Sequence, residues 1–171
     1  MSGHGRRLTW LLAALTACLP VRRPTVELQP GASLRSYRIF AVGSVGDESG
    51  YRFPYDITDS LRSRLAKRLR EHGLSVASGD SAAVGAGGGG AVLRIESRLT
   101  TFRSRGIALM FGGGPGLGSR CELTSTLVDG ASGRRLGEIR AAEDDVLAPF
   151  TVLMTCARMV ADEIDRRVRG R

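Results

Sequence analysis

Residues 56–73 have the sequence DITDSLRSRLAKRLREHG, and this stretch decides the fold class because its apolar residues recur at helical spacing. Every fourth position carries a large aliphatic side chain: Ile57, Leu61, Leu65 and Leu69. The pattern predicts an amphipathic helix with one buried stripe. Asp56 can accept hydrogen bonds from the first turn, and Gly73 is a typical residue for a helix end.

Strand-forming segments lie on both sides of this helix. The segment from Tyr37 to Val45 is rich in aromatic and β-branched residues, and Leu74 to Ala77 follows the helix directly. Between the first strand and the helix, a loop from Gly46 to Pro54 carries Tyr51 and Phe53. These segments predict a strand–helix–strand unit.

The rest of the chain predicts three more strands and one more helix. Ala91 to Arg103 and Cys121 to Leu127 alternate between apolar and polar residues, and Leu136 to Ala142 returns after a turn at residues 129–133. A last helix begins near Pro149, and apolar residues line its inner face: Leu153, Cys156, Val160, Ile164 and Val168. We therefore predict an α+β fold, with a mixed sheet of about five strands and two helices packed on one face.

The N-terminus has the order that is typical of a secretory signal. Arg6 and Arg7 precede an uncharged run from Leu8 to Ala17. The segment Leu15-Thr16-Ala17-Cys18 fits the lipobox, which directs diacylglycerol to the cysteine and cleavage just before it. The uncharged run is shorter than the about 20 apolar residues of a spanning helix. We predict a lipoprotein signal peptide at residues 1–17; another cleaved signal and a buried helix are the alternatives.

The segment after Cys18 has the composition of a tether, because it contains prolines and has no apolar period. Leu19 to Leu34 could reach ~50 Å at full stretch. The predicted organisation is therefore a signal peptide at residues 1–17, a lipidated tether at 18–35 and a single α+β periplasmic domain at 36–171.

The whole pattern resembles a family of bacterial lipoproteins catalogued as a domain of unknown function, number 4410. The resemblance rests on the lipobox, the strand beginning at Leu34, the helix beginning at Thr58, the strand Ala91–Phe102 and the turn after Leu127. It implies a small α/β sandwich like those of other periplasmic modules, which act by docking to partners. It brings no catalytic residues with it. Leu19 stands where resembling lipoproteins retained at the inner membrane have aspartate, so we expect the outer membrane, facing the periplasm.

The residues give little support to an enzyme. After the signal peptide the only histidine is His72, at a helix end, which excludes a site made of several histidines. The glycine-rich segment Gly113–Arg120 has no lysine to reach a phosphate, and Pro115 removes one amide donor. We predict a protein that is not an enzyme and binds no cofactor or metal.

Cys121 and Cys156 both fall on predicted core faces. An oxidising compartment permits a disulfide between them, while buried free thiols are equally common in small cores. Both states stay open at the level of sequence.

The first helix carries a dense set of cations: Arg62, Arg64, Lys67, Arg68 and Arg70. Its acidic residues Asp56 and Asp59 lie at the other end, so only Glu71 is near. The last helix instead offers acid-first pairs at i, i+4: Asp162–Arg166, Glu163–Arg167 and Asp165–Arg169. The first helix is thus either a solvated face or a contact for an anionic surface.

The apolar segment from Gly106 to Gly118 is too short to cross a bilayer as a hairpin, in which each strand needs about 9–11 residues. It is either a buried connection or a contact for a partner or membrane.

The formal net charge of the chain is +8, and it stays basic without Arg6 and Arg7. This charge suits anionic lipid, peptidoglycan or an acidic protein, and the export signal argues against nucleic acid.

The sequence predicts two alternative functions. The first is a non-catalytic, lipid-anchored module that docks an unknown envelope protein or helps to assemble a trans-envelope complex. The second is a binder of anionic lipid or glycan in envelope lipid transport. In both, membrane lipid is bound through acylation of Cys18.

Overall fold

The helix predicted from the fourfold aliphatic repeat is present as α1 (Ile57–Glu71) in the computed structural model, which describes residues 23–77, 91–104, 118–145 and 149–171. The Asp56 carboxylate accepts hydrogen bonds from the backbone amides of Thr58, at 3.0 Å, and Asp59, at 3.1 Å. Gly73 has a φ of 77°, a conformation that favours glycine and ends the helix.

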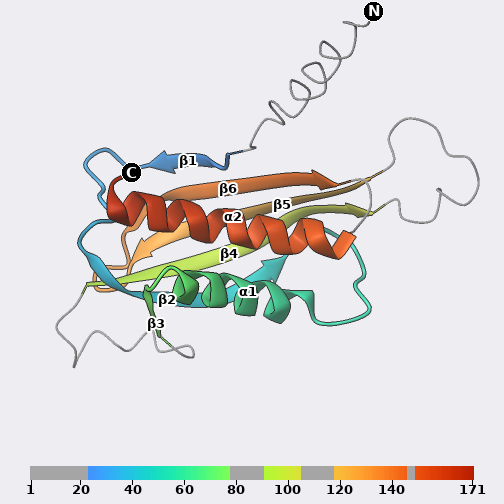
Figure 1. The fold of residues 1–171 in the computed structure, drawn as a ribbon, viewed down its shortest axis with the longest axis horizontal. Coiled ribbons are helices and arrows are strands. Elements are labelled where there is room, and N and C mark those ends of the chain that lie inside the picture. Colours follow the sequence, from blue (N-terminus) through green and yellow to red (C-terminus); the bar gives the residue numbers. More distant parts are fainter. Residues whose placement is uncertain (1–22, 78–90, 105–117, 146–148) are drawn as a thin grey trace, which may run out of the picture.

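The sheet has six strands in the order β1-β6-β5-β4-β2-β3 (Figure 1). The strands are β1 (Thr25–Leu28), β2 (Tyr37–Asp47), β3 (Ser75–Ala77), β4 (Ala91–Ser104), β5 (Ser119–Asp129) and β6 (Arg135–Asp145). β2 pairs in parallel with both β3 and β4, and the other pairs are antiparallel. This arrangement confirms the predicted mixed sheet.

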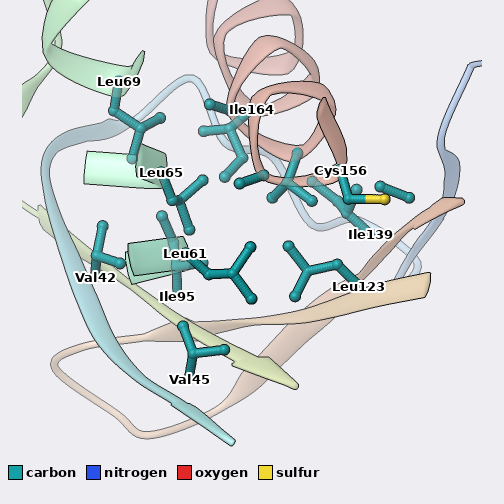
Figure 2. Close-up of a cluster of buried hydrophobic side chains, with 14 of the residues drawn as sticks. Val42, Val45, Leu61, Leu65, Leu69, Ile95, Leu123, Ile139, Cys156 and Ile164 are labelled. Carbon is teal, nitrogen blue, oxygen red and sulfur yellow. The ribbon is translucent and has the colours of Figure 1, made fainter. Parts of the chain in front are cut away.

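Both helices cover the same face of the sheet (Figure 1). α1 packs on β2, and α2 (Pro149–Arg169) packs on β5 and β6. Figure 2 shows Leu61, Leu65 and Leu69 extending from α1 into a cluster that also contains Ile164 and Cys156 of α2. Full burial of one such side chain is worth about 1.5–3 kcal/mol, so this layer supplies the main stabilisation of the fold.

The sheet begins earlier in the chain than the sequence predicts. β1 lies inside the segment expected to be a tether, and it pairs with β6 from Thr25 opposite Arg140 to Leu28 opposite Gly137. Leu34, also assigned to the tether, is only 2% exposed. The predicted boundary at residue 36 is therefore wrong. A four-residue strand between Pro24 and Pro30 is too short to show a period, and prolines beside an edge strand are compatible with pairing.

The face of the sheet away from the helices carries paired charges. Arg94 lies 2.7 Å from Glu96, and Arg98 lies 3.3 Å from Glu48. Glu138, which is 5% exposed, is bound by both Arg135 and Arg140. These arginines neutralise the carboxylates beside them, so this face has little net charge to offer a partner.

A side-chain hydrogen bond closes the end of the sheet near the β5–β6 turn. The Tyr37 hydroxyl donates to Asp129 Oδ2 at 2.6 Å, and the Ser132 amide and hydroxyl both donate to Oδ1 at 2.7 Å. The bond from Tyr37, followed by those from Ser132, lowers the pKa of Asp129 to about 2. Burial and the bond to Asp129 raise the pKa of Tyr37 to about 12.

We expect this contact to make stability depend on acid. The pKa of Asp129 is lower in the folded chain than in the unfolded one, so its contribution is complete above about pH 4 and is lost as the pH falls towards 2. Tyr37→Phe removes the strongest donor and should flatten the decline in the free energy of unfolding over this range. Urea titrations at a series of pH values would measure this, and identical profiles for the two proteins would contradict it.

Candidate docking surfaces

Four cations are spread across the side of α1 that faces away from the core, called here the basic face: Arg62, Arg64, Lys67 and Arg70. Within the part of the chain that the structure describes, none of the four has a carboxylate within 4.0 Å. Lys67 and Arg70 are exposed, and Arg62 and Arg64 are half-buried. Like charges at this spacing repel one another, so α1 keeps them at a small cost in stability.

Arg68, the fifth cation predicted for this surface, belongs to the contact between the helices. Its Nε donates to Asp162 Oδ1 of α2 at 2.7 Å, and its Nη1 donates to Glu71 at 3.0 Å. His72 Nε2 lies 2.7 Å from the same Asp162 oxygen. Burial alone would raise the pKa of Asp162, but the hydrogen bonds from Arg68 and His72 hold it below its usual value. Sequence reasoning missed this cluster because its members lie far apart in the chain.

Two of the three ion pairs predicted within α2 are confirmed. Glu163 accepts from Arg167 at 2.8 Å, and Asp165 accepts from Arg169 at 2.6 Å. The predicted Asp162–Arg166 pair is wrong, because Asp162 turns toward α1 and Arg166 pairs with Glu163 instead. Hence α2 pairs its last three arginines with its own carboxylates, while four cations of α1 have no carboxylate within 4.0 Å among the described residues. The hydrogen bond from Arg68 lowers the pKa of Glu71, and the charges of Lys67 and Arg64 act on Glu71 from farther away and lower it further.

Two arginines of the basic face also border a groove of about 260 Å³ between α1 and the β2–β3 edge of the sheet. The groove is lined by Val42, Asp59, Arg62, Ser63, Ala66, Arg70 and Ala77. Among the described residues β3 pairs with Ile39–Ala41, and β2 extends beyond them to Asp47. Two arginines and one aspartate line the groove, and this excess of positive charge is suited to an acidic protein segment.

A larger hollow of about 550 Å³ lies on the face of the sheet opposite the helices. Its lining includes small residues of β2, namely Ala41, Gly43, Ser44 and Gly46. Longer polar side chains of β4 and β5 also line it: Arg94, Glu96, Arg98 and Thr126. Its two arginines are already paired with Glu96 and Glu48. An anionic ligand would therefore have to compete with carboxylates of the protein.

Aromatic side chains gather at the end of the sheet where β4 ends and β5 begins. Tyr51, Phe53 and Phe102 contact one another, with ring centroids 4.8–4.9 Å apart. Tyr55 and Phe150 form a second pair, with centroids 6.2 Å apart. The sequence signal was the presence of three aromatic residues within 51–55, which periodicity does not detect.

The fold brings Cys121 of β5 and Cys156 of α2 together as two buried free thiols. Cys156 Sγ donates to the Cys121 carbonyl at 3.5 Å. The hydrogen bond with Cys156, together with burial, raises the pKa of the Cys121 thiol. Thiolates are the reactive form, so this thiol is protected while the chain is folded.

We expect alkylation to report this protection. A maleimide at pH 8 should leave Cys121 and Cys156 unmodified in the folded protein and should add to both after unfolding without reductant. Mass spectrometry of the residue 119–171 region would count the adducts. Absence of both adducts after unfolding would show that the two cysteines are joined by a disulfide.

Several predicted features lie outside the described residues. These are the signal peptide, the lipidation site Cys18 and nearly all of the apolar segment Gly106–Gly118. Among the described helices, none has the length and apolar composition needed to cross a membrane. The described side chains also contain no group of three or more His, Cys, Asp or Glu residues placed to hold a metal ion.

Comparison with known proteins finds structures of similar fold but identifies no family. No family model and no curated protein matches the chain. The structure is similar to PelC from Paraburkholderia phytofirmans, a dodecamer, with a TM-score of 0.59 and 16% identity over 83% of this chain and 97% of that one. It is also similar to the hypothetical protein CT253 from Chlamydia trachomatis, with a TM-score of 0.54 and 7% identity over 78% and 99% of the two chains. A minor lipoprotein from Acinetobacter baumannii scores 0.43 at 16% identity, covering 78% and 94%. The chain thus has a small α+β fold that occurs in other bacterial proteins, and the family expected from its sequence stays a prediction.

Proposed function

We propose that this chain is a non-catalytic lipoprotein, anchored through Cys18 at the outer membrane and facing the periplasm, that docks an acidic envelope protein through the basic face of α1. The observation that carries the docking role is the contrast between the helices. α2 pairs Arg166, Arg167 and Arg169 with its own carboxylates, whereas no cation of the basic face has a carboxylate within 4.0 Å among the described residues. An acidic partner would supply the missing charges.

The anchor rests on the lipobox at residues 15–18 and on the position of β1. Because the sheet begins at Thr25, only Leu19–Pro24 separates the acylated cysteine from the folded domain. Labelling cells with a palmitate analogue tests the anchor, with the Cys18→Ser chain as the control. Label in the parent chain and none in the variant is expected, and equal labelling of both would refute the anchor.

Assembly into a larger complex is supported by the fold alone, since PelC, a similar structure, forms a dodecamer. Proteins with one fold often act in different ways, so this likeness suggests self-association without specifying it. Sedimentation of the purified lipoprotein in detergent would show whether copies of this chain associate.

The docking role is tested by reversing two exposed charges of the basic face, Lys67→Glu and Arg70→Glu. Crosslinking in intact cells, followed by purification of the chain, should recover a defined acidic protein with the parent and much less with the variant. The matched control is Arg134→Glu with Arg171→Glu, which changes the net charge equally at exposed positions outside both helices. We expect the Lys67 and Arg70 substitutions to cost at most about 1 kcal/mol of stability. Equal recovery with both variants would mean that the basic face is only solvated.

Arg68 is unsuitable for this test, although the sequence places it among the cations of this helix. Arg68→Glu would bring a second carboxylate beside Asp162, so we expect that change to lower stability. A loss of partner after that change would report damage to the helix contact.

The second candidate function, binding of anionic lipid or glycan, is favoured by the hollow on the open face of the sheet. Extraction of the purified domain with organic solvent distinguishes the two functions. Phospholipid recovered in proportion to protein, and lost when Gly46→Leu fills the hollow, would favour ligand binding over docking.

A further inference from the structure

All three large hydrophobic side chains that are strongly exposed among the described residues lie at one end of the molecule, called here the aromatic end. Tyr51 is 40% exposed, and Tyr55 and Phe150 are each 49% exposed. Tyr51 rests on Phe102 near the end of β4, and Tyr55 contacts Phe150 in the first turn of α2. A single exposed aromatic residue needs no explanation. Three of them at one end of the molecule expose apolar surface together, and such surface is typical of a contact site.

The aromatic end is the end of the molecule where β4 and β6 end and where both helices begin. β6 ends at Asp145 opposite Ser119, and β4 ends at Ser104 opposite the same residue. α1 and α2 both begin here, as the contact between Tyr55 and Phe150 shows. The β5–β6 turn at residues 130–134 lies at the opposite end of the sheet (Figure 1).

The anchoring segment approaches from the aromatic end. β1 is antiparallel to β6, so the chain before Thr25, which pairs with Arg140, comes from the side where β6 ends. Leu19–Pro24 can extend ~20 Å, and the part of β6 from Arg140 to Asp145 is ~17 Å long. A lipid on Cys18 can therefore lie level with the aromatic end.

We infer that the aromatic end rests on the lipid surface in which Cys18 is anchored. The chemistry fits the interfacial zone of a bilayer, because tyrosine rings favour the headgroup level and phenylalanine can enter the boundary between headgroups and acyl chains. Arg52 and Arg103 are exposed beside these rings, and arginine can extend its guanidinium to lipid phosphates. In this orientation the helices stand on the membrane and the basic face points sideways into the periplasm. The inference rests on the proposed anchoring at Cys18.

A single tryptophan at each end of the molecule tests this orientation. The chain has one tryptophan, Trp10, which the proposed cleavage before Cys18 removes, so the mature lipoprotein carries no competing probe. Phe150→Trp places the probe at the aromatic end, and Ala131→Trp places it in the exposed β5–β6 turn. The purified lipoproteins are reconstituted into vesicles of phosphatidylcholine and phosphatidylglycerol, in which brominated lipid quenches only tryptophans that reach the bilayer.

Loss of most of the emission from the Phe150→Trp chain, with little loss from the Ala131→Trp chain, is the expected result. No quenching at position 150 would overturn the inference and would assign the aromatic end to a protein partner or to solvent. Equal quenching at both positions would also overturn it, because the domain would then lie flat. The mass of each purified chain shows independently whether Cys18 is acylated. Failure of the anchor is thus distinguished from failure of the orientation, because quenching is scored only for chains whose mass shows that Cys18 is acylated.

Discussion

Leu65→Ala should lower the free energy of unfolding by about 3–4 kcal/mol, the largest effect that we expect from a single side chain. Leu65 is 1% exposed and lies in the middle of α1, where the helix packs on the sheet and beside α2. Removal of its terminal carbons leaves a cavity that neither layer can close, because β2 and β4 are fixed by their pairing.

Urea unfolding followed by circular dichroism would measure this loss, and Lys67→Ala is the matched control. Lys67 is exposed on the same helix, and alanine favours helices, so the control should change stability by less than about 0.5 kcal/mol. A loss below about 1.5 kcal/mol for Leu65→Ala would contradict the packing described here, because burial of the side chain alone is worth more than that.

Gly137→Ala should release β1 from the sheet. A Cβ at Gly137 would overlap the backbone oxygen of Glu27 and lie 2.7 Å from Leu28 Cδ2. Neither β1 nor β6 can move aside without losing its ladder, so overpacking should cost about 1–3 kcal/mol. The shorter of the two pairings, that of β1, should break first.

Hydrogen exchange would show this release as faster deuterium uptake in residues 25–28, with little change in β4 and β5. The control is Gly46→Ala, where the new Cβ would lie 3.6 Å from Arg98 Cγ, an ordinary contact. If residues 25–28 exchange at the parent rate in Gly137→Ala, then β1 is not held against Gly137 as described.

The layered fold could be predicted because its central elements repeat a local pattern. The aliphatic residues of α1, and the alternation of Leu93, Ile95 and Leu99 in β4, each identify an element and its buried side. β1 could not be predicted, because its partner β6 lies near the other end of the chain and four residues contain too little pattern.

The candidate surfaces were predictable only in part. Counting charges identified the cations of α1, but it could not show that Arg68 turns toward Asp162, since that contact depends on how two distant helices pack. The same limit explains why the predicted Asp162–Arg166 pair is wrong. The i, i+4 spacing predicts pairing in an isolated helix, but here Asp162 pairs with Arg68 of the other helix. The aromatic end was missed because its residues come from a loop, a strand and a helix.

The pairing of β1 with β6 also sets an order of events during folding. Thr25 leaves the ribosome well before its partner Arg140, which follows more than a hundred residues later. Contacts between such distant residues form slowly, because the long intervening loop must close first. Until then the outer edge of β6 is open and can pair with strands of other chains. A chain held at the membrane by its first residues would complete its sheet only there, so the last folding step and the final placement of the domain would coincide.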